Sequence, residues 1–264
     1  MEVVMRLLAV NGSFRGARGA CGRILEAIHR GFLRGGGSAE IVNLAEKRVE
    51  SCRGCNHCQA AKSYRCVFEG KDDVAEIFEG IRGADVVLYA TPVYLFGISS
   101  LLKRLIERFH SAAPVDDLKI TDSGILFHAT DRALMCKPLV SIVVSDNVED
   151  VTVENAKGYF KNYCMFMDAR HIAHIERRSA SVWLASLGQP QAEIGRRARR
   201  ILEAYEEMGK ELAKGMQVSK RTKHQAETAL IRIPPVVKLA WRIPSMRPKI
   251  KEKMNKIART YFVP

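Results

Sequence analysis

Residues 3–20 read VVMRLLAVNGSFRGARGA, and this stretch decides the fold. Its first part, Val3 to Gly12, is an apolar run that ends in a turn, as expected for a central parallel strand buried on both faces. A helical pattern follows from about Ala20 to Leu33 and stops at three consecutive glycines, residues 35–37. The stretch therefore predicts a strand, a glycine-rich turn and a helix.

Strands and helices alternate along the rest of the chain up to residue 214. Further strands are expected at residues 39–44, 84–94, 139–146 and 169–176, and further helices at residues 74–81, 99–109, 151–167 and 191–214. Such alternation predicts an α/β fold, with helices on both faces of a five-stranded parallel sheet and the ligand at the carboxyl ends of the strands. Residues 112–137 exceed a plain connection and are interpreted as an insertion.

The loop after the first strand, NGSFRGARGA, is a candidate phosphate site. It places Ser13, Arg15, Arg18 and Gly19 between a strand and a helix. Free N–H groups at a helix N-terminus, a hydroxyl and a guanidinium suit an anion. The glycines match neither a dinucleotide fingerprint nor a Walker loop, so a single monoester phosphate such as that of FMN is favoured. A purely structural turn is the alternative.

A second candidate segment, TPVYLFGISSLLKRLIERF, starts at the end of the third strand. Pro92 is expected to fix a turn there, Tyr94 and Phe96 offer aromatic surface, and Gly97 allows close approach of the backbone. A flat tricyclic ring would fit such a segment, which also contains Thr91 and Val93. The alternative is that the two aromatic side chains pack against the next helix.

Cysteines gather in the run SCRGCNHCQAAKSYRC, which has the pattern C-x₂-C-x₂-C-x₇-C. Closely spaced thiolates of this kind are ligands for iron–sulfur clusters or zinc. Tandem two-residue gaps favour a cluster, and we expect one 4Fe–4S centre; zinc, or buried or disulfide-linked cysteines, are the alternatives. An odd number of cysteines without an export signal predicts a reducing cytoplasm. The four expected metal ligands are Cys52, Cys55, Cys58 and Cys66.

The net charge of +13 is concentrated at the end of the chain. Residues 215–264 contain twelve Lys or Arg against Glu227 and Glu252, and interpose them among large apolar residues. We interpret residues 1–214 as one domain and residues 215–264 as a basic arm. Apolar residues on a short, proline-broken segment are usually buried, which favours packing on the partner subunit of a dimer. Contact with a membrane surface or with an acidic electron carrier such as ferredoxin are the alternatives.

Taken together, these motifs resemble the flavodoxin-like NAD(P)H-dependent FMN reductase superfamily, and the cysteine run resembles its iron–sulfur flavoprotein branch. The matching residues are Gly12 to Arg15, the cysteine run, Asp72-Asp73, and Pro92 to Tyr94. The resemblance implies strand order 2-1-3-4-5, bound FMN, and a homodimer or dimer of dimers. It also implies electron transfer between a donor (ferredoxin or NAD(P)H), the cluster and the flavin.

Two departures from the family pattern affect the expected flavin contacts. Gly19-Ala20-Cys21 replaces G-N-T, so Ser13, Arg15, Arg18 and backbone N–H groups, including those of Gly19 and Ala20, are expected to hold the phosphate. SDNVED, at residues 145–150, replaces a glycine-rich loop after the fourth strand. Two other functions stay open: a cluster-free NAD(P)H-dependent FMN or quinone reductase, and a zinc-knuckle protein that binds nucleic acid through its basic tail.

Overall fold

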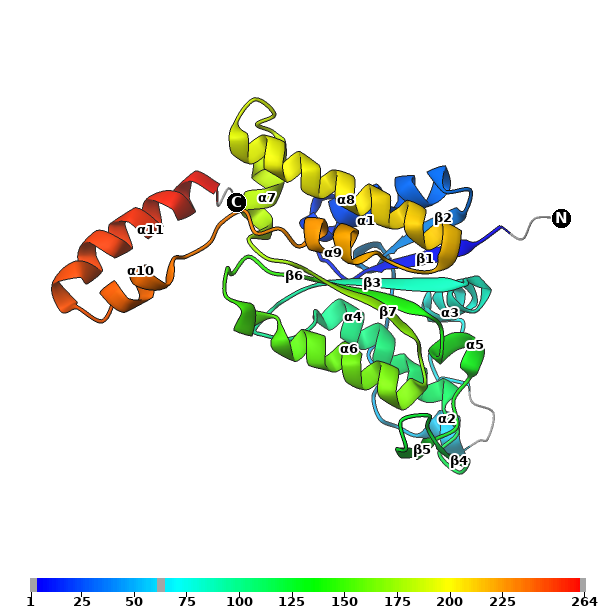
Figure 1. Ribbon diagram of the computed structural model, residues 1–264. Coiled ribbons are helices and arrows are strands. Elements are labelled where there is room, and N and C mark those ends of the chain that lie inside the picture. Colours follow the sequence, from blue (N-terminus) through cyan, green and yellow to red (C-terminus); the bar gives the residue numbers. More distant parts are fainter. Residues whose placement is uncertain (1–3, 61–64, 262–264) are drawn as a thin grey trace.

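A five-stranded parallel sheet forms the centre of the computed structural model, which describes residues 4–60 and 65–261 (Figure 1). The strand order is β2-β1-β3-β6-β7, which is the predicted flavodoxin-like order 2-1-3-4-5 when only the strands of this sheet are counted. The predicted α/β fold is thus confirmed. The strands are β1 (Arg6–Asn11), β2 (Ser38–Asn43), β3 (Val86–Pro92), β6 (Leu139–Val144) and β7 (His171–Arg177).

Helices cover both faces of the sheet because alternate strand residues point to opposite sides. In β1, Leu7 and Ala9 join one hydrophobic core, whereas Leu8 and Val10 join the other. The first core is completed by α1 (Ala20–Arg34), α7 (Ala180–Leu187) and α8 (Glu193–Gly215). The second is completed by α3 (Val74–Gly83), α4 (Ser100–Glu107) and α6 (Glu154–Met167).

The remaining elements are short and lie in the connections. The expected insertion contains an antiparallel pair and one helical turn, namely β4 (Leu118–Ile120), β5 (Leu126–His128) and α5 (Arg132–Met135). The cysteine run contributes α2 (His57–Ala60). Single 3₁₀ turns are η1 (Gly16–Arg18), η2 (Leu44–Glu46), η3 (Arg108–Ala112) and η4 (Asp150–Thr152).

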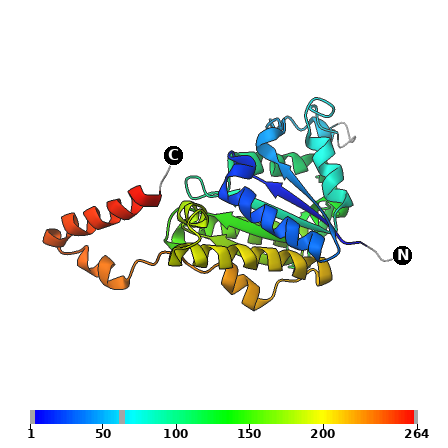
Figure 2. The same cartoon turned by 90° about the horizontal axis from the view of Figure 1, so that it is seen from above.

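The segment that the sequence assigns to the arm has two different parts. Its first part, with α9 (Lys220–Ala226), packs on the body, where Thr222, Ala226 and Leu230 are buried. Its second part projects from the body as α10 (Pro235–Ala240), η5 (Pro244–Met246) and α11 (Arg247–Tyr261), as both views show (Figures 1 and 2). Within the described residues, no helix has the length and apolar character needed to span a membrane.

Helices α1 and α8 approach each other so closely that two glycines are required between them. A Cβ atom on Gly31 would lie 1.8 Å from the carbonyl oxygen of Glu206, and one on Gly209 would lie 2.0 Å from that of Ile28. Both neighbours are backbone atoms, which cannot move without shifting a helix. This contact fixes α1 against α8 and thereby fixes the loop that precedes α1.

We expect Gly31→Ala to lower the free energy of unfolding by about 1–3 kcal/mol, because the added methyl group overpacks this helix contact. Gly158→Ala is the matched control: Gly158 lies within α6 and a Cβ there would meet no atom within 4 Å. That substitution should raise stability by about 0.5–1 kcal/mol, since alanine favours a helix over glycine. Urea denaturation of both variants measures the difference, and equal effects would contradict it.

Candidate functional site

The loops that follow β1 and β3 meet at the carboxyl edge of the sheet. The Gly12 N–H donates to Ala90 O at 2.8 Å, and the Ser99 N–H donates to Thr91 Oγ1 at 2.9 Å. A Cβ on Gly12 would lie 2.9 Å from both Ser99 Oγ and Leu102 Cβ, so no other side chain fits between the loops. The predicted phosphate loop and the predicted aromatic segment therefore border the same edge.

Asn11 shapes the first of these loops, although the sequence analysis did not single it out. Its buried side-chain amide donates to Gly16 O at 3.0 Å and to Asn43 Oδ1 at 2.9 Å. Its Oδ1 accepts from the Ser13 N–H at 3.0 Å. One side chain thus joins the ends of β1 and β2 to both sides of the loop. The sequence signal that points to this role of Asn11 is a polar residue at the end of an apolar strand.

Three residues expected at the phosphate lie together at the start of α1. Ser13 Oγ accepts from the Arg15 N–H at 3.2 Å, and a Cβ on Gly19 would lie 2.9 Å from Arg15 Cβ and 3.1 Å from Ser13 Oγ. Gly19 is the N-cap of α1 and supplies no side-chain acceptor, so the N–H groups of the first turn, which begins at Ala20, have no side-chain cap. Arg18 is exposed in η1 beside them. This is the chemistry of an anion site.

The aromatic segment forms a turn two residues later than the sequence predicted. Pro92 does not fix that turn, because it is the last residue of β3 and pairs with Val144. The turn is closed by hydrogen bonds of 3.2 and 3.1 Å between the backbones of Tyr94 and Gly97. Leu95 and Phe96 both adopt positive φ, +45° and +67°, which costs non-glycine residues about 1–3 kcal/mol each. Strain of this kind concentrates at ligand sites.

The side chains of this turn face solvent instead of packing on the next helix. Tyr94 and Phe96 are exposed, whereas Thr91 is buried and Val93 packs against the core. The Tyr94 ring lies 6.4 Å from that of Phe14, between centroids. Burial raises the pKa of Tyr94, and the Arg15 charge partly opposes that shift, which places the two loops within electrostatic reach. An open aromatic surface thus adjoins the anion site.

The four predicted metal-ligating cysteines line one small cavity, together with Phe68, Arg108 and His110. Burial raises the pKa of the Cys58 thiol, and the nearby Cys66 and Cys52 raise it further. Across residues 4–60 and 65–261, however, no three His, Cys, Asp or Glu side chains are placed to share a single metal ion.

Arg108, which lines the cysteine cavity, belongs to a buried ion pair. Arg108 pairs with Asp72, and the side chains are only 3% and 1% exposed. Arg108 also donates to Glu50 O at 3.1 Å and lies 5.2 Å from the Phe68 ring centroid. In the sequence Asp72 is notable only as part of the family resemblance, and Arg108 has no local signal, because no sequence pattern links two residues 36 positions apart.

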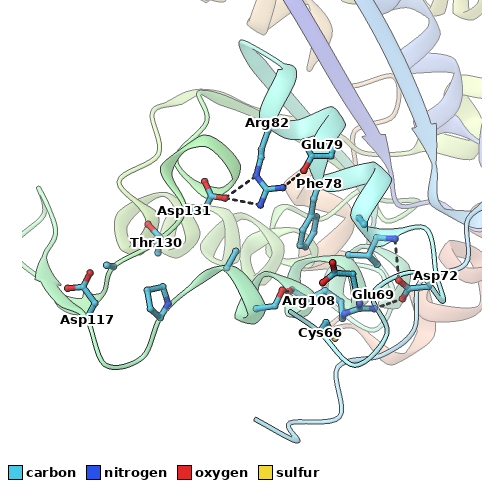
Figure 3. Close-up of a pocket in the computed structure, with 16 residues that line it drawn as sticks. Cys66, Glu69, Asp72, Phe78, Glu79, Arg82, Arg108, Asp117, Thr130 and Asp131 are labelled. Atoms are coloured by element: carbon cyan, nitrogen blue, oxygen red, sulfur yellow. Dashed lines mark hydrogen bonds and ion pairs between the residues drawn. The ribbon is translucent and has the colours of Figure 1, made fainter. Parts of the chain in front are cut away.

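A second, larger cavity of about 560 Å³ opens on the other side of Arg108, beside Cys66 (Figure 3). Arg82 lines this cavity and forms ion pairs with Asp131 at 2.8 Å and with Glu79 at 2.6 Å. Residues just after the C-terminal end of α4 line both cavities. Ser99, which caps the N-terminus of α4, lies at the sheet edge. The structure thus separates the two predicted sites by the length of this helix, about 12 Å at 1.5 Å per residue.

Comparisons with known proteins agree on one family. The family model described as NADPH-dependent FMN reductase matches residues 5–155. An iron–sulfur flavoprotein of Archaeoglobus fulgidus is 31% identical over 108 residues, 41% of this chain and 50% of that protein. One from Methanocaldococcus jannaschii is 32% identical over 108 residues, 39% and 51% of the two chains. The matched segment thus spans about half the length of these curated relatives.

Solved structures share the fold at lower sequence identity. An FMN-dependent NADH-azoreductase from Bacillus anthracis, solved in complex with FMN, superposes with a TM-score of 0.56. It is 16% identical and covers 80% of this chain and 100% of its own. At that identity the match shows the flavodoxin-like architecture, including the sheet edge described above.

The Arg108–Asp72 pair predicts a large loss of stability when only one partner is changed. Arg108→Gln leaves a buried carboxylate without its counter-charge, which costs about 3–5 kcal/mol. Lys103→Gln removes one partner of the exposed Lys103–Glu107 pair and should cost less than about 1 kcal/mol. The double variant Arg108→Gln/Asp72→Asn should recover part of the loss. Denaturant unfolding measures all three, and a neutral Arg108→Gln would contradict the assignment.

Proposed function

This chain belongs to the NADPH-dependent FMN reductase family, and on that premise we propose that it is a flavin-dependent oxidoreductase. The observation that carries the proposal is the uncapped N-terminus of α1, set beside Ser13 and Arg15 at the junction of β1 and β3. In a doubly wound sheet, neighbouring strands whose connections leave in opposite directions open a crevice at this point. That is the place where such folds bind their cofactors.

The residues at this edge suit the two ends of FMN. Ser13, Arg15, Arg18 and the N–H groups at Gly19 and Ala20 would hold the phosphate, and residues 91–97 would line the ring. Bound FMN would supply transfer of a hydride or of electrons, with NAD(P)H as the expected donor. The chain's own part is to bind and orient: Asn11 holds the loop in one shape, and the turn at Leu95 and Phe96 presents backbone and aromatic surface to the ring.

The cysteine cavity supports a second redox centre in the same chain. Four cysteines with tandem two-residue gaps line this cavity, and that spacing supports the 4Fe–4S assignment over the zinc-knuckle alternative. A cluster held by Cys52, Cys55, Cys58 and Cys66 would supply one-electron transfer. We therefore propose an iron–sulfur flavoprotein that connects a two-electron couple to a one-electron carrier such as ferredoxin. A cluster-free FMN or quinone reductase is the alternative.

The oligomeric state is part of this proposal. We expect a homodimer or a dimer of dimers, as the family resemblance implies. Light scattering coupled to gel filtration measures the mass directly, and a monomer at all concentrations would contradict this expectation.

Arg15→Ala should weaken FMN binding about tenfold to a hundredfold, because a charge-assisted contact contributes about 1.5–3 kcal/mol. Arg23→Ala is the matched control, since Arg23 lies on α1 but pairs with Glu26 at 3.1 Å, away from the loop. Titration of the flavin-free protein with FMN gives both affinities. Equal affinity of Arg15→Ala and the parent protein would show that the phosphate loop is assigned wrongly.

Protein purified without oxygen should contain iron and acid-labile sulfide and show a broad absorption shoulder beside the flavin bands. Cys58→Ser removes a buried ligand and should lose both iron and sulfide. Cys136→Ser should keep them, since Cys136 contacts Thr130 at 3.5 Å and does not line the cysteine cavity. Flavin without iron in the parent protein would leave the cluster-free reductase, and a colourless protein would contradict both.

A further inference from the structure

The projecting hairpin, residues 231–261, lies beyond the part of the chain that the family model matches. It stands away from the sheet and its helices in both views (Figures 1 and 2). Lys238 of α10 binds Glu149 at 2.6 Å, and α11 approaches α7. Within the hairpin, Arg247 Nε donates to Trp241 O at 2.9 Å. The hairpin is therefore a folded attachment with a defined anchor on the body.

The apolar side chains of the projecting hairpin face outward. Val236 and Leu239 lie three residues apart on α10, and Ile243 follows that helix; the three are 65%, 62% and 49% exposed. Trp241, Met246 and Met254 are also exposed. The sequence favours packing of these residues on the partner subunit of a dimer. Within this chain they are not buried. An exposed apolar face of this size on an ordered segment indicates a binding surface.

The charge of the same segment favours an anionic partner. Residues 231–261 contain nine Lys or Arg and one acidic residue, Glu252. Lys249, Lys251 and Lys253 project from α11 into solvent. Basic side chains beside Trp, Leu and Ile on a helical segment are typical of surfaces that enter the headgroup region of anionic bilayers. Pairing of this hairpin with the same hairpin of a second copy is less favourable, because each would bring nine Lys or Arg and only one acidic residue to the contact.

We propose that the projecting hairpin binds the surface of anionic lipid membranes. Val236, Leu239, Trp241 and Ile243 enter the boundary between headgroups and acyl chains, and the lysines of α11 contact the anionic headgroups. Glu149, which anchors the hairpin through Lys238, follows β6 at the same sheet edge as the proposed flavin site. Membrane contact would hold that edge near the lipid. The membrane contact itself does not depend on the flavin proposal.

Sedimentation of the full-length protein with vesicles tests the proposal. We expect binding to phosphatidylcholine vesicles that contain phosphatidylglycerol, no binding to phosphatidylcholine alone, and weakening by salt. Lys249→Gln/Lys251→Gln/Lys253→Gln should weaken binding by on the order of a hundredfold, about fivefold per charge. The apolar double variant Val236→Ser/Leu239→Ser should lose vesicle binding entirely. Leu118→Ser, which changes an exposed apolar residue on β4, should leave it unchanged.

Tryptophan fluorescence reports insertion separately, because the chain has only two tryptophans. Trp183 is fully buried and donates to Ala198 O at 3.1 Å, so a shift on adding vesicles comes from Trp241. The emission should move to shorter wavelength with anionic vesicles, and Trp241→Phe should remove the shift.

Three results would overturn the proposal. One is the absence of binding to anionic vesicles at low salt. Another is binding that persists in Val236→Ser/Leu239→Ser without a fluorescence shift, which would show a charge effect alone. The third is a lower oligomeric mass of Val236→Ser/Leu239→Ser in the absence of lipid, with no vesicle binding by the parent protein. That result would assign the hairpin to a second copy of the chain.

Discussion

The buried side-chain amide of Asn11 sets the geometry of the proposed flavin site, at the carboxyl ends of β1 and β3. Asn11 closes β1, binds Asn43 at the end of β2, and holds Ser13 and Gly16 on the two sides of the loop. Buried polar groups must find partners, so few loop conformations satisfy all these bonds at once. The loop in turn sets where α1 begins, and the glycine contact with α8 holds that helix in place. The proposed anion site is thereby held in shape by the chain itself.

Most of the fold could be predicted because its signals are local. Buried parallel strands are continuous apolar runs, and the helices between them carry a clear period, so β1, β3 and β6 could be predicted from local sequence. The strand order followed from the family resemblance. The helix α7 was missed because its residues are apolar on all sides and show no such period. The expectation that Pro92 fixes a turn was wrong because β3 extends as far as Pro92. A proline lacks a backbone N–H, and this is tolerated at the end of a strand.

The candidate site divides in the same way. Ser13, Arg15 and Gly19 lie in one short segment and residues 94–97 in another, so each group could be predicted from its own local sequence. The positive φ angles of Leu95 and Phe96 could not be predicted. The partners of the cysteine cavity come from distant segments. Arg108 follows α4, which begins at the carboxyl edge of the sheet. Only the packing of α4 brings the Arg108 guanidinium to Asp72. Such pairings depend on the folded chain and not on any local pattern.

Helix α4 joins the two regions, and a helix is not electrically neutral along its axis. Its N-terminus, with a partial positive charge, lies at the β1–β3 edge, and its C-terminus, with a partial negative charge, faces the cysteine cavity. Added negative charge is therefore more stable at the sheet edge than among the cysteines, apart from the compensation by Arg108. The helix that separates the two regions by its length therefore also makes them electrostatically unequal, with the sheet edge the more favourable place for an anion.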